Sequence, residues 1–544
     1  MKRFLNKKII IPAALVVVFL STTAFNSNFF EIAKQIEIFT TMFKELNMNY
    51  VDETNPGDLM DTAIKSMLED LDPYTRFYNE QDVQSARINQ SGDFTGIGAK
   101  VRTMKDKLVI VEPYKGYAAD KADLKAGDEI IKIDNVDITN FKDDAGNLLQ
   151  GTAGTEVALT YKRQGKINTA TVTRESLEID AVPHYSMIND DTGYIVLRKF
   201  TNKASSQTEK ALNSLKGLGA KKIVLDLRGN PGGLLNEAVN IVNLFVPKDQ
   251  LVVTTKSKIK KYNKTYKTKR EPVDLEIPIV VLINGRSASA SEIVSGALQD
   301  LDRAVIVGAR SFGKGLVQRP KPLTYGTQMK ITISRYYTPS GRCIQALDYW
   351  NRDENGKATR TKKQDYKAFK TKKGRSVFDG GGVQPDIEIE VAKQTPITEA
   401  IEEENLIFDF ATEYFYKNNV SDLKGFEFSN NDFEGFKSYL EKQNFSFETE
   451  TEKALNEALI VAQEEKLDNA ISSEYNDVIS ALNSYKSAAI NKNKEKLSGL
   501  LQDEIIKRYF YAEGLYDYYK ANNTEIKKAL EILNNPSEYN KILN

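Results

Sequence analysis

Short apolar runs alternate with helical stretches in the middle of the chain. Four runs have the length and composition of strands that are buried on both faces, and they cover residues 193–197, 222–226, 279–283 and 304–307. Amphipathic helical stretches lie between several of them. The alternation, which extends from about residue 170 to residue 392, predicts a core of α/β layers.

The segments before this core show two other patterns. Residues 28–88 are predicted to be helical, because apolar residues after Asn55 recur at helical spacing and Pro73 disfavours helix at Asp72. From residue 92 to 166 the pattern changes to short strands, such as 107–112 and 129–134, with turns at Gly127-Asp128 and Asp134-Asn135. This change predicts a small β domain after the helical part.

The chain beyond residue 396 is charged and helical. Two stripes at helical spacing predict core faces of a helical domain: Leu455, Ala458, Leu459 and Ala462, and Ile505, Tyr509, Ala512, Tyr516 and Tyr519. Two lysine-rich stretches, 256–270 and 357–375, are predicted to be solvated hairpins or loops, with contact to anionic lipid as the alternative.

Composition narrows the chemistry. The chain has 544 residues, which suggests several domains, and its 75 Lys and Arg balance 75 Asp and Glu, so a nucleic-acid partner is not expected. One histidine, His184, and one cysteine, Cys343, exclude an internal disulfide, a thiolate zinc site and HExxH zinc chemistry. We therefore expect no metal or other cofactor, and a structural or surface role for His184.

The N-terminus has the features of an export signal. Four basic residues, Lys2, Arg3, Lys7 and Lys8, precede an apolar run at residues 9–25. The sequence leaves open whether residues 1–27 are a signal peptide, cleaved after Thr22-Thr23-Ala24, or a retained anchor that contacts the membrane. In both cases we expect the rest of the chain in the cell envelope, periplasmic or otherwise outside the cytoplasm.

One segment suggests a nucleophile. In the stretch 284–293 an apolar strand runs into small residues and then into a helix that begins near Glu292. A serine at such a turn is exposed, and the next backbone N–H points to where an oxyanion would form. The alternative is that Ser287, Ser289 or Ser291 only caps the helix. The segment alone does not choose between the two.

Two other motifs overlap the following stretch. Residues 308–315 approach a phosphate-binding loop, but Gly315 stands where a magnesium-binding hydroxyl is needed, and Pro320 and Pro322 oppose the required helix. Ser311 and Lys314 match an SxxK motif, which needs both residues on one helical turn, and the glycines on both sides of Lys314 disfavour a helix there.

Several ordered motifs resemble those of the C-terminal processing peptidases, also called tail-specific proteases. The resemblance covers about residues 35–392 and rests on these motifs: Tyr50–Glu53, Leu71–Pro73, Asp226–Gly233, Ser287–Glu292, Gly296–Asp300, Ser311–Gln318, Tyr336–Arg342 and Gly380–Asp386. Cys343 stands where the family usually has a small polar residue, a departure that does not touch the implied chemistry. The C-terminal helical region lies outside the resemblance.

The resemblance implies a serine endopeptidase with a crotonase- or Clp-protease-like α/β core. Ser289 would be the nucleophile, Lys314 the general base and Gln318 the residue that positions the lysine amine. The oxyanion hole would consist of the backbone N–H groups of Ala290 and Gly232, with Gly232 preferred over Gly233. To accept a proton, Lys314 would have to be largely uncharged, which requires burial away from carboxylates.

Residues 92–166 resemble a PDZ domain. Residues Gly96, Ile97, Gly98 and Ala99 would form its carboxylate-binding loop, where a peptide with an accessible C-terminus adds as an extra strand. The alternative is a β domain that only spaces its neighbours. For the C-terminal helical region the sequence leaves open substrate docking, an adaptor and self-association.

The expected architecture is therefore multidomain α+β. It has a signal or anchor (1–27), a helical region (28–88), a PDZ domain (89–168), a peptidase core (169–394) and a C-terminal helical domain (395–544). A PDZ scaffold with a decayed hydrolase core is the rival function. Loss of Ser289 or Lys314 would mark such a scaffold, and both residues are present.

Overall fold

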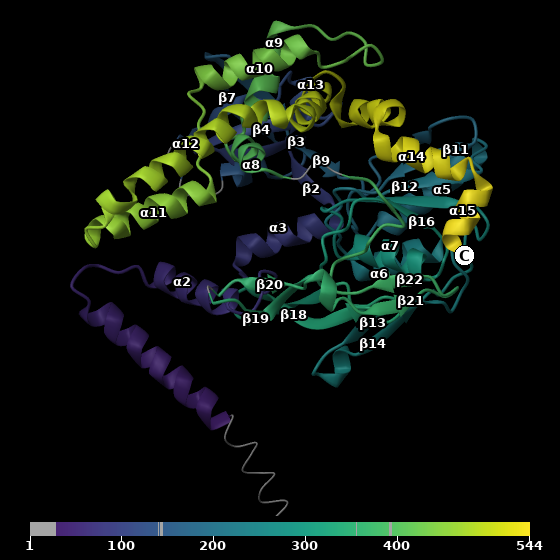
Figure 1. Cartoon of the computed structure of the whole chain (residues 1–544), viewed down its shortest axis with the longest axis horizontal. Coiled ribbons are helices and arrows are strands. Elements are labelled where there is room, and N and C mark those ends of the chain that lie inside the picture. Colours follow the sequence, from purple (N-terminus) through teal and green to yellow (C-terminus); the bar gives the residue numbers. More distant parts are fainter. Residues whose placement is uncertain (1–28, 140, 142–144, 355, 391–393) are drawn as a thin grey trace, which may run out of the picture. The chain divides into compact units, whose positions relative to one another are not determined.

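The computed structural model describes residues 29–139, 141, 145–354, 356–390 and 394–544. The predicted signal or anchor segment lies outside the described residues. The chain divides into two compact units, one of Met1–Asn79 with Pro320–Ile331 and the other of Glu80–Arg319 with Thr332–Asn544. Figure 1 shows the helices and strands, coloured along the chain from purple to yellow.

The first unit contains the predicted N-terminal helices. Residues 29–49 are helical, and α2 (Pro56–Glu69) begins after Asn55, whose side chain accepts the N–H groups of Gly57 and Asp58. Proline at the first helical position suits this start, because its missing N–H has no partner there in any case. The sequence did not predict β1 (Arg76–Tyr78), which pairs antiparallel with residues 328–330 of β18 (Gln328–Tyr337).

In the second unit, the predicted β domain follows α3 (Glu80–Ser91). Its sheet has the order β3-β4-β5-β7-β8, with β6 paired to β5. The strands are β3 (Ala99–Met104), β4 (Lys107–Pro113), β5 (Glu129–Ile133), β6 (Val136–Asp137), β7 (Glu156–Arg163) and β8 (Lys166–Thr173). Short helices α4 (Ala118–Lys121) and η1 (Ala145–Leu149) cover its apolar core, while β2 (Asp93–Gly96) pairs with β9 (Glu175–Glu178). The strands predicted at 107–112 and 129–134 are confirmed.

The predicted peptidase core contains a six-stranded sheet of order β10-β11-β12-β15-β16-β23. All neighbours are parallel except β10 and β11. The strands are β10 (His184–Met187), β11 (Thr192–Val196), β12 (Lys222–Asp226), β15 (Ile279–Ile283), β16 (Val305–Gly308) and β23 (Ile387–Glu388). The four apolar runs therefore form its central strands, as the sequence predicted.

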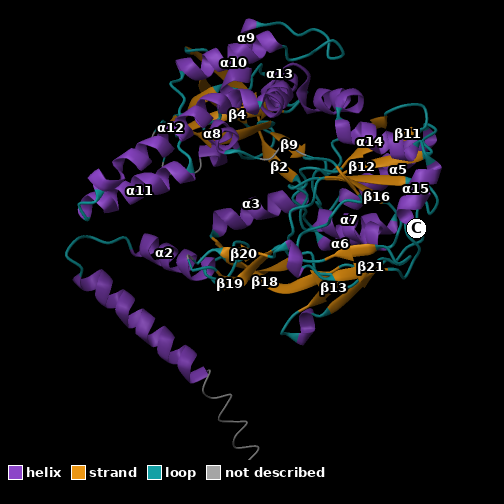
Figure 2. Ribbon diagram, viewed as in Figure 1, coloured by secondary structure: helices purple, strands orange, loops and turns teal. Residues whose placement is uncertain are grey.

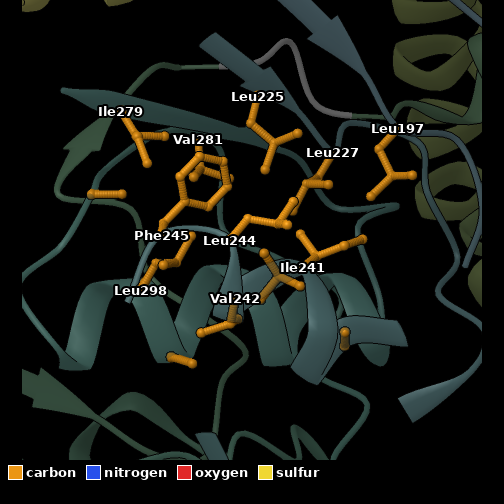
Figure 3. Close-up of a cluster of buried hydrophobic side chains, with 14 of the residues drawn as sticks. Leu197, Leu225, Leu227, Ile241, Val242, Leu244, Phe245, Ile279, Val281 and Leu298 are labelled. Atoms are coloured by element: carbon orange, nitrogen blue, oxygen red, sulfur yellow. The ribbon is translucent and has the colours of Figure 1, made fainter. Parts of the chain in front are cut away.

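Alternate residues of these strands serve two apolar layers. One face packs against α5 (Ala204–Gly217), α6 (Leu235–Asn243) and α7 (Ala290–Asp300), and Figure 3 shows part of that layer, with Leu225 and Val281 facing Phe245 and Leu244. The opposite face is covered by the C-terminal helices α14 (Thr524–Leu533) and α15 (Pro536–Leu543), together with Tyr516. Both faces are thus buried, as parallel sheets require.

A second group of strands adjoins this core. β17 (Leu316–Pro322) pairs with β18, which also pairs with β13 (Leu251–Lys256), and β13 pairs with β14 (Lys264–Lys267). The first lysine-rich stretch therefore lies in a largely exposed hairpin, as predicted. The second lysine-rich stretch contains β20 (Ala358–Arg360) and β21 (Ala368–Lys370), which pair with β19 (Leu347–Arg352) and β22 (Ser376–Phe378).

The C-terminal region is helical, as expected (Figure 2). Its helices are α8 (Pro396–Glu403), α9 (Leu406–Lys417), α10 (Asn430–Lys442), α11 (Glu450–Glu464), α12 (Asp468–Lys492) and α13 (Lys494–Asn522), followed by α14 and α15. The α13 stripe is confirmed as a core face. The α11 stripe is confirmed as a core face only in part, because Ala462 is buried whereas Ala458 is exposed. In the part of the chain that the structure describes, no helix is both long and apolar enough to cross a membrane.

Candidate active site

Ser289 occupies a strained turn between β15 and α7. It is the residue before the first turn of α7, and its backbone has φ 56° and ψ −110°. A side chain in this region of backbone space costs about 1–3 kcal/mol, and such residues concentrate at functional sites. Neighbouring Ser287 and Ser291 are fully buried and hydrogen-bonded to backbone carbonyls, whereas Ser289 is partly exposed. Among these serines, Ser289 is therefore the one available to a substrate.

The glycine loop 229–233 lies directly against this turn. At Gly232, where φ is +99°, a β-carbon would stand 2.9 Å from both the Ala290 nitrogen and the Ser289 β-carbon. At Gly233 it would instead stand 2.4 Å from the Phe200 carbonyl oxygen. The structure thus brings Gly232, Ser289 and Ala290 together, and the proximity favours Gly232 over Gly233. Only glycine fits at this close approach.

Asn230 joins the glycine loop to the nucleophile turn. Its side chain accepts the Gly232 N–H at 2.9 Å and donates to the Leu197 carbonyl at 2.8 Å. Its own carbonyl accepts the Ala288 N–H at 3.0 Å and the Ser291 hydroxyl at 2.9 Å. For Gly232 to donate to an oxyanion, its N–H must exchange or share the Asn230 acceptor. The role of Gly232 in an oxyanion hole remains a prediction.

The segment that carries Lys314 is extended. Residues 310–315 have no regular secondary structure and lead into β17, not into a helix. A phosphate-binding loop needs a helix N-terminus at this point, and an SxxK pair needs one helical turn. The structure therefore removes both competing interpretations of the segment. Ser311 is instead buried, and its hydroxyl accepts the Val383 N–H at 2.6 Å.

Glu292 connects Ser289 to this segment. The fully buried carboxylate accepts the N–H groups of Ser289 at 2.8 Å and Lys314 at 2.9 Å on one oxygen. The other oxygen accepts the Ser311 hydroxyl at 2.5 Å and the Gly313 N–H at 2.6 Å. Burial raises the pKa of the Glu292 carboxyl, and the four accepted hydrogen bonds only partly oppose that rise. One side chain thus fixes the backbones of both candidate catalytic residues.

We predict that Glu292→Gln lowers both stability and turnover. The amide has one acceptor oxygen, so two of the four donors lose their partner. Buried unpaired donors should lower the free energy of unfolding by about 2–4 kcal/mol, and the resulting displacement of Ser289 or Lys314 should lower kcat by about 100-fold. Urea denaturation and kcat per folded enzyme measure the two effects.

A matched control is Glu237→Gln, which alters another buried carboxylate that accepts the Ser205 N–H at 2.7 Å. We expect it to destabilise the protein without changing kcat. The pH profile adds a second criterion. A protonated Glu292 cannot accept all four bonds, so activity should fall as pH decreases through its raised pKa, and this acid limb should be absent in Glu292→Gln. Equal kcat in the Glu292 variant and wild type would refute the connection.

Gln318 lies on β17, and its amide donates to the Thr332 hydroxyl at 3.1 Å. Its predicted contact with the Lys314 amine remains a prediction. Tyr336 was not anticipated: this buried phenol donates to the Ser289 carbonyl at 3.2 Å. Burial, together with the nearby Glu292, raises the pKa of Tyr336 well above its usual value, so it remains a hydrogen-bond donor.

The predicted carboxylate-binding loop lies between β2 and β3. Gly98 has φ +78°, and a β-carbon there would stand 2.5 Å from the Tyr117 β-carbon. The carbonyls of Ile97 and Gly98 accept the Ala119 and Tyr114 N–H groups at 2.7 and 2.8 Å. These bonds fix the loop, and Gly96 and Ala99 continue into the flanking strands. Since β3 is at the edge of its sheet, a peptide strand could pair beside it.

The lone histidine, His184, and the lone cysteine, Cys343, are both partly buried. His184 packs between the rings of Tyr194 and Tyr516, and its ring nitrogen lies 2.9 Å from the Ser186 hydroxyl. Its pKa is lowered mainly by burial. Within the described ranges no cluster of three or more His, Cys, Asp or Glu side chains is arranged to hold a metal ion.

Comparisons with known proteins identify related domains in three parts of the chain. Family models match residues 191–349 (Peptidase family S41), 95–173 (PDZ domain) and 397–533 (Probable PDZ-protease, C-terminal helical domain). A carboxy-terminal-processing protease of Bartonella bacilliformis is 37% identical over 349 residues, which cover 62% of this chain and 79% of that protein.

Two further matches are more distant. A probable CtpA-like serine protease of Staphylococcus haemolyticus is 34% identical over 310 residues, covering 56% of this chain and 61% of that protein. A solved photosystem II D1 C-terminal processing protease aligns with 64% of this chain and 86% of its own at 26% identity, with a TM-score of 0.37.

Proposed function

The chain belongs to the carboxy-terminal-processing proteases of peptidase family S41, and we propose that it cleaves proteins held by their C-termini through a Ser289–Lys314 dyad. The observation that carries the proposal is the strained Ser289 turn, packed against Gly232 and tied through Glu292 to the Lys314 backbone. No histidine is needed in this scheme.

In each half of the reaction, Lys314 first accepts one proton and then returns it. The Ser289 hydroxyl oxygen attacks the scissile carbonyl and gives its proton to the neutral Lys314 amine. Collapse of the tetrahedral intermediate breaks the C–N bond, and the lysine returns the proton to the leaving amine. Water then attacks the acyl-enzyme and gives a proton to Lys314. Collapse of this second intermediate breaks the ester C–O bond and frees the new carboxyl terminus, and Lys314 returns the proton to the Ser289 oxygen. A lysine amine is ordinarily protonated at neutral pH, so the fold must favour the neutral form of Lys314.

The PDZ domain supplies the C-terminal selectivity. A substrate chain would add beside β3, and its terminal carboxylate would bind backbone N–H groups of the Gly96–Ala99 loop. We also propose that the substrates are exported proteins, because the basic residues before the apolar run 9–25 direct the chain out of the cytoplasm.

The test is cleavage of one peptide in two forms, one ending in an apolar residue with a free carboxylate and the other amidated at that end. We expect the free form to be cleaved with kcat/KM about 10- to 100-fold higher, because the amide cannot make the charge-assisted hydrogen bonds. Equal cleavage of both forms would remove the C-terminal selectivity. If neither form is cleaved, the peptidase proposal itself is wrong.

A further inference from the structure

The end of α13 and the start of α14 do more than cover the core sheet. Besides their apolar contacts with it, the C-terminal part of the chain places four polar side chains at the ends of β11 and β12. We call them the C-terminal clamp: Tyr516, Tyr519, Asn523 and Glu525. They contact Arg198 and Arg228, and Arg228 immediately precedes the glycine loop 229–233 of the candidate active site.

Arg228 is held from two sides. On the core side, its Nε and Nη2 atoms donate to the two oxygens of Asp226 at 3.0 and 2.7 Å. On the clamp side, its Nη1 atom lies 2.8 Å from the Asn523 side-chain oxygen and 3.2 Å from a Glu525 oxygen. Arg228 is only 8% exposed, and Glu525 is largely shielded as well. A guanidinium with carboxylates on two sides has its position fixed at both ends.

Asp226 and Arg228 on the core side stay charged even without the C-terminal clamp. Burial alone would raise the pKa of Asp226, but the Arg228 and Arg198 guanidiniums outweigh burial and lower it to about 2. The Tyr194 hydroxyl also donates to Asp226 at 2.6 Å. Loss of Glu525 would therefore leave Arg228 paired with Asp226, so the buried charge would not be orphaned.

Arg198 provides a second connection. Its Nη1 atom donates to the Arg228 carbonyl, and its Nε atom donates to the Tyr516 hydroxyl at 3.2 Å. The guanidinium also lies over the Tyr516 ring, 5.1 Å from the centroid. The clamp thus restrains Arg228 through both its side chain and its backbone carbonyl.

Arg228 is connected through the glycine loop to the turn that carries Ser289. The next N–H, that of Gly229, donates to the Asn284 side chain at 3.0 Å, and Asn230 then holds Gly232 and Ala288 as described above. Asn284 lies in the loop between β15 and α7, which also carries Ser289. A displacement of Arg228 would accordingly change the position of Gly232 against Ser289.

We propose that Glu525 and Asn523 are positioning residues for this peptidase, holding the glycine loop in the geometry that stabilises the oxyanion. The proposal rests on the proposed function of Ser289. It gives the C-terminal segment a role in turnover, beyond covering the sheet. Neither residue touches the substrate, so the effect should appear in kcat and not in substrate binding.

Two variants separate this role from folding. Glu525→Gln removes the charge at nearly constant shape. Asn523→Ser keeps a capping side chain for the Ile526 N–H, now at 3.1 Å from Asn523, but is too short to reach Arg228. The matched control is Glu531→Gln on the same helix, where the exposed carboxylate forms an i, i+3 pair with Lys528. Active sites are counted by titration of Ser289 with a fluorophosphonate, so that unfolded protein does not lower the apparent kcat.

We expect both clamp variants to lower kcat per titrated site by about tenfold with KM within about twofold, a smaller loss than removal of an oxyanion donor causes. Affinity for a peptide boronate, which forms a tetrahedral adduct with the serine, should fall in parallel. Glu525→Asp should recover part of kcat, and Glu531→Gln should match wild type.

A clamp with only a structural role would lower the melting temperature and leave kcat per titrated site and boronate affinity unchanged, which would overturn the proposal. If both clamp variants cleave as well as the wild-type protein does, the proposal for the C-terminal clamp is wrong and the peptidase proposal is retained. If wild type itself does not cleave, both fail together.

Discussion

Replacement of Ser289 by alanine is expected to reduce kcat by roughly 10⁴- to 10⁶-fold. In the proposed mechanism the side-chain oxygen forms the acyl bond, and alanine offers no atom in its place. The fold should persist, because Ser289 is held through its backbone: Glu292 accepts its N–H and Tyr336 donates to its carbonyl. Peptide cleavage followed by chromatography, with circular dichroism as the check on folding, measures the loss.

A matched control for Ser289→Ala is available on the same helix. The Ser295 hydroxyl is buried and donates to the Ser291 carbonyl at 2.9 Å, one turn away. Ser295→Ala should cost some stability but keep cleavage within several-fold of wild type. Cleavage by Ser289→Ala at a rate near that of the Ser295 variant would show that another residue is the nucleophile.

Replacement of Lys314 by alanine is the second large effect. We expect kcat to fall by about 10³- to 10⁵-fold, since the variant loses the group that accepts the serine proton. Folding should be retained for a specific reason. The bond from residue 314 to Glu292 uses the backbone N–H, at 2.9 Å, and alanine keeps that donor. Thermal unfolding and single-turnover cleavage test the two statements separately.

Lys314→Arg distinguishes a base from a positive charge. Arginine has a pKa above about 12 and stays protonated, so it can supply a charge but cannot take a proton. We expect Lys314→Arg to be as inactive as Lys314→Ala. Exposed Lys267 on the β14 hairpin is a suitable control site, because Lys267→Ala removes a lysine far along the chain from the motif. Activity of Lys314→Arg near wild type would contradict the general-base role.

The α/β layers could be predicted from the sequence, because the apolar pattern that marks each buried strand is local. The run Ile279–Ile283 is apolar at every position, as a strand covered on both faces must be, and it forms β15 at those residues. The sequence did not predict which segment covers the second face of the core sheet. The chain returns to the sheet at α14, more than 200 residues after β15, and the periodicity of a helix does not say which surface it will meet.

The candidate site was predictable to a similar degree. Motif resemblance picked out Ser289 and Lys314, but the connection between them depends on Glu292. Its spacing of three residues from Ser289 is that of a capping box, a signal that could have identified it. Tyr336 gave no such signal, because its contact with the Ser289 carbonyl forms only after distant segments pack together. The bond from the Gly232 N–H to Asn230 spans only two residues and is a local contact.

The prediction that Ala458 faces a core failed for a physical reason. Helical periodicity indicates an apolar face but not how much surface will cover it. Helices α11 and α12 pack on each other, and along much of both helices apolar side chains remain exposed, including Ile460 and Val478. A two-helix arm has no third layer to bury the rest of the stripe.

The central claim is that the Ser289 hydroxyl is activated by an uncharged Lys314 amine. The most direct test is the rate of covalent labelling by a fluorophosphonate as a function of pH, with the modified peptide identified by mass spectrometry. We predict a single adduct on Ser289. Its rate should rise with one ionisation whose apparent pKa lies below the usual lysine value of about 10.4, and that ionisation should be lost in Lys314→Ala. An adduct on another residue, or an unchanged rate and pH profile in Lys314→Ala, would contradict the mechanism.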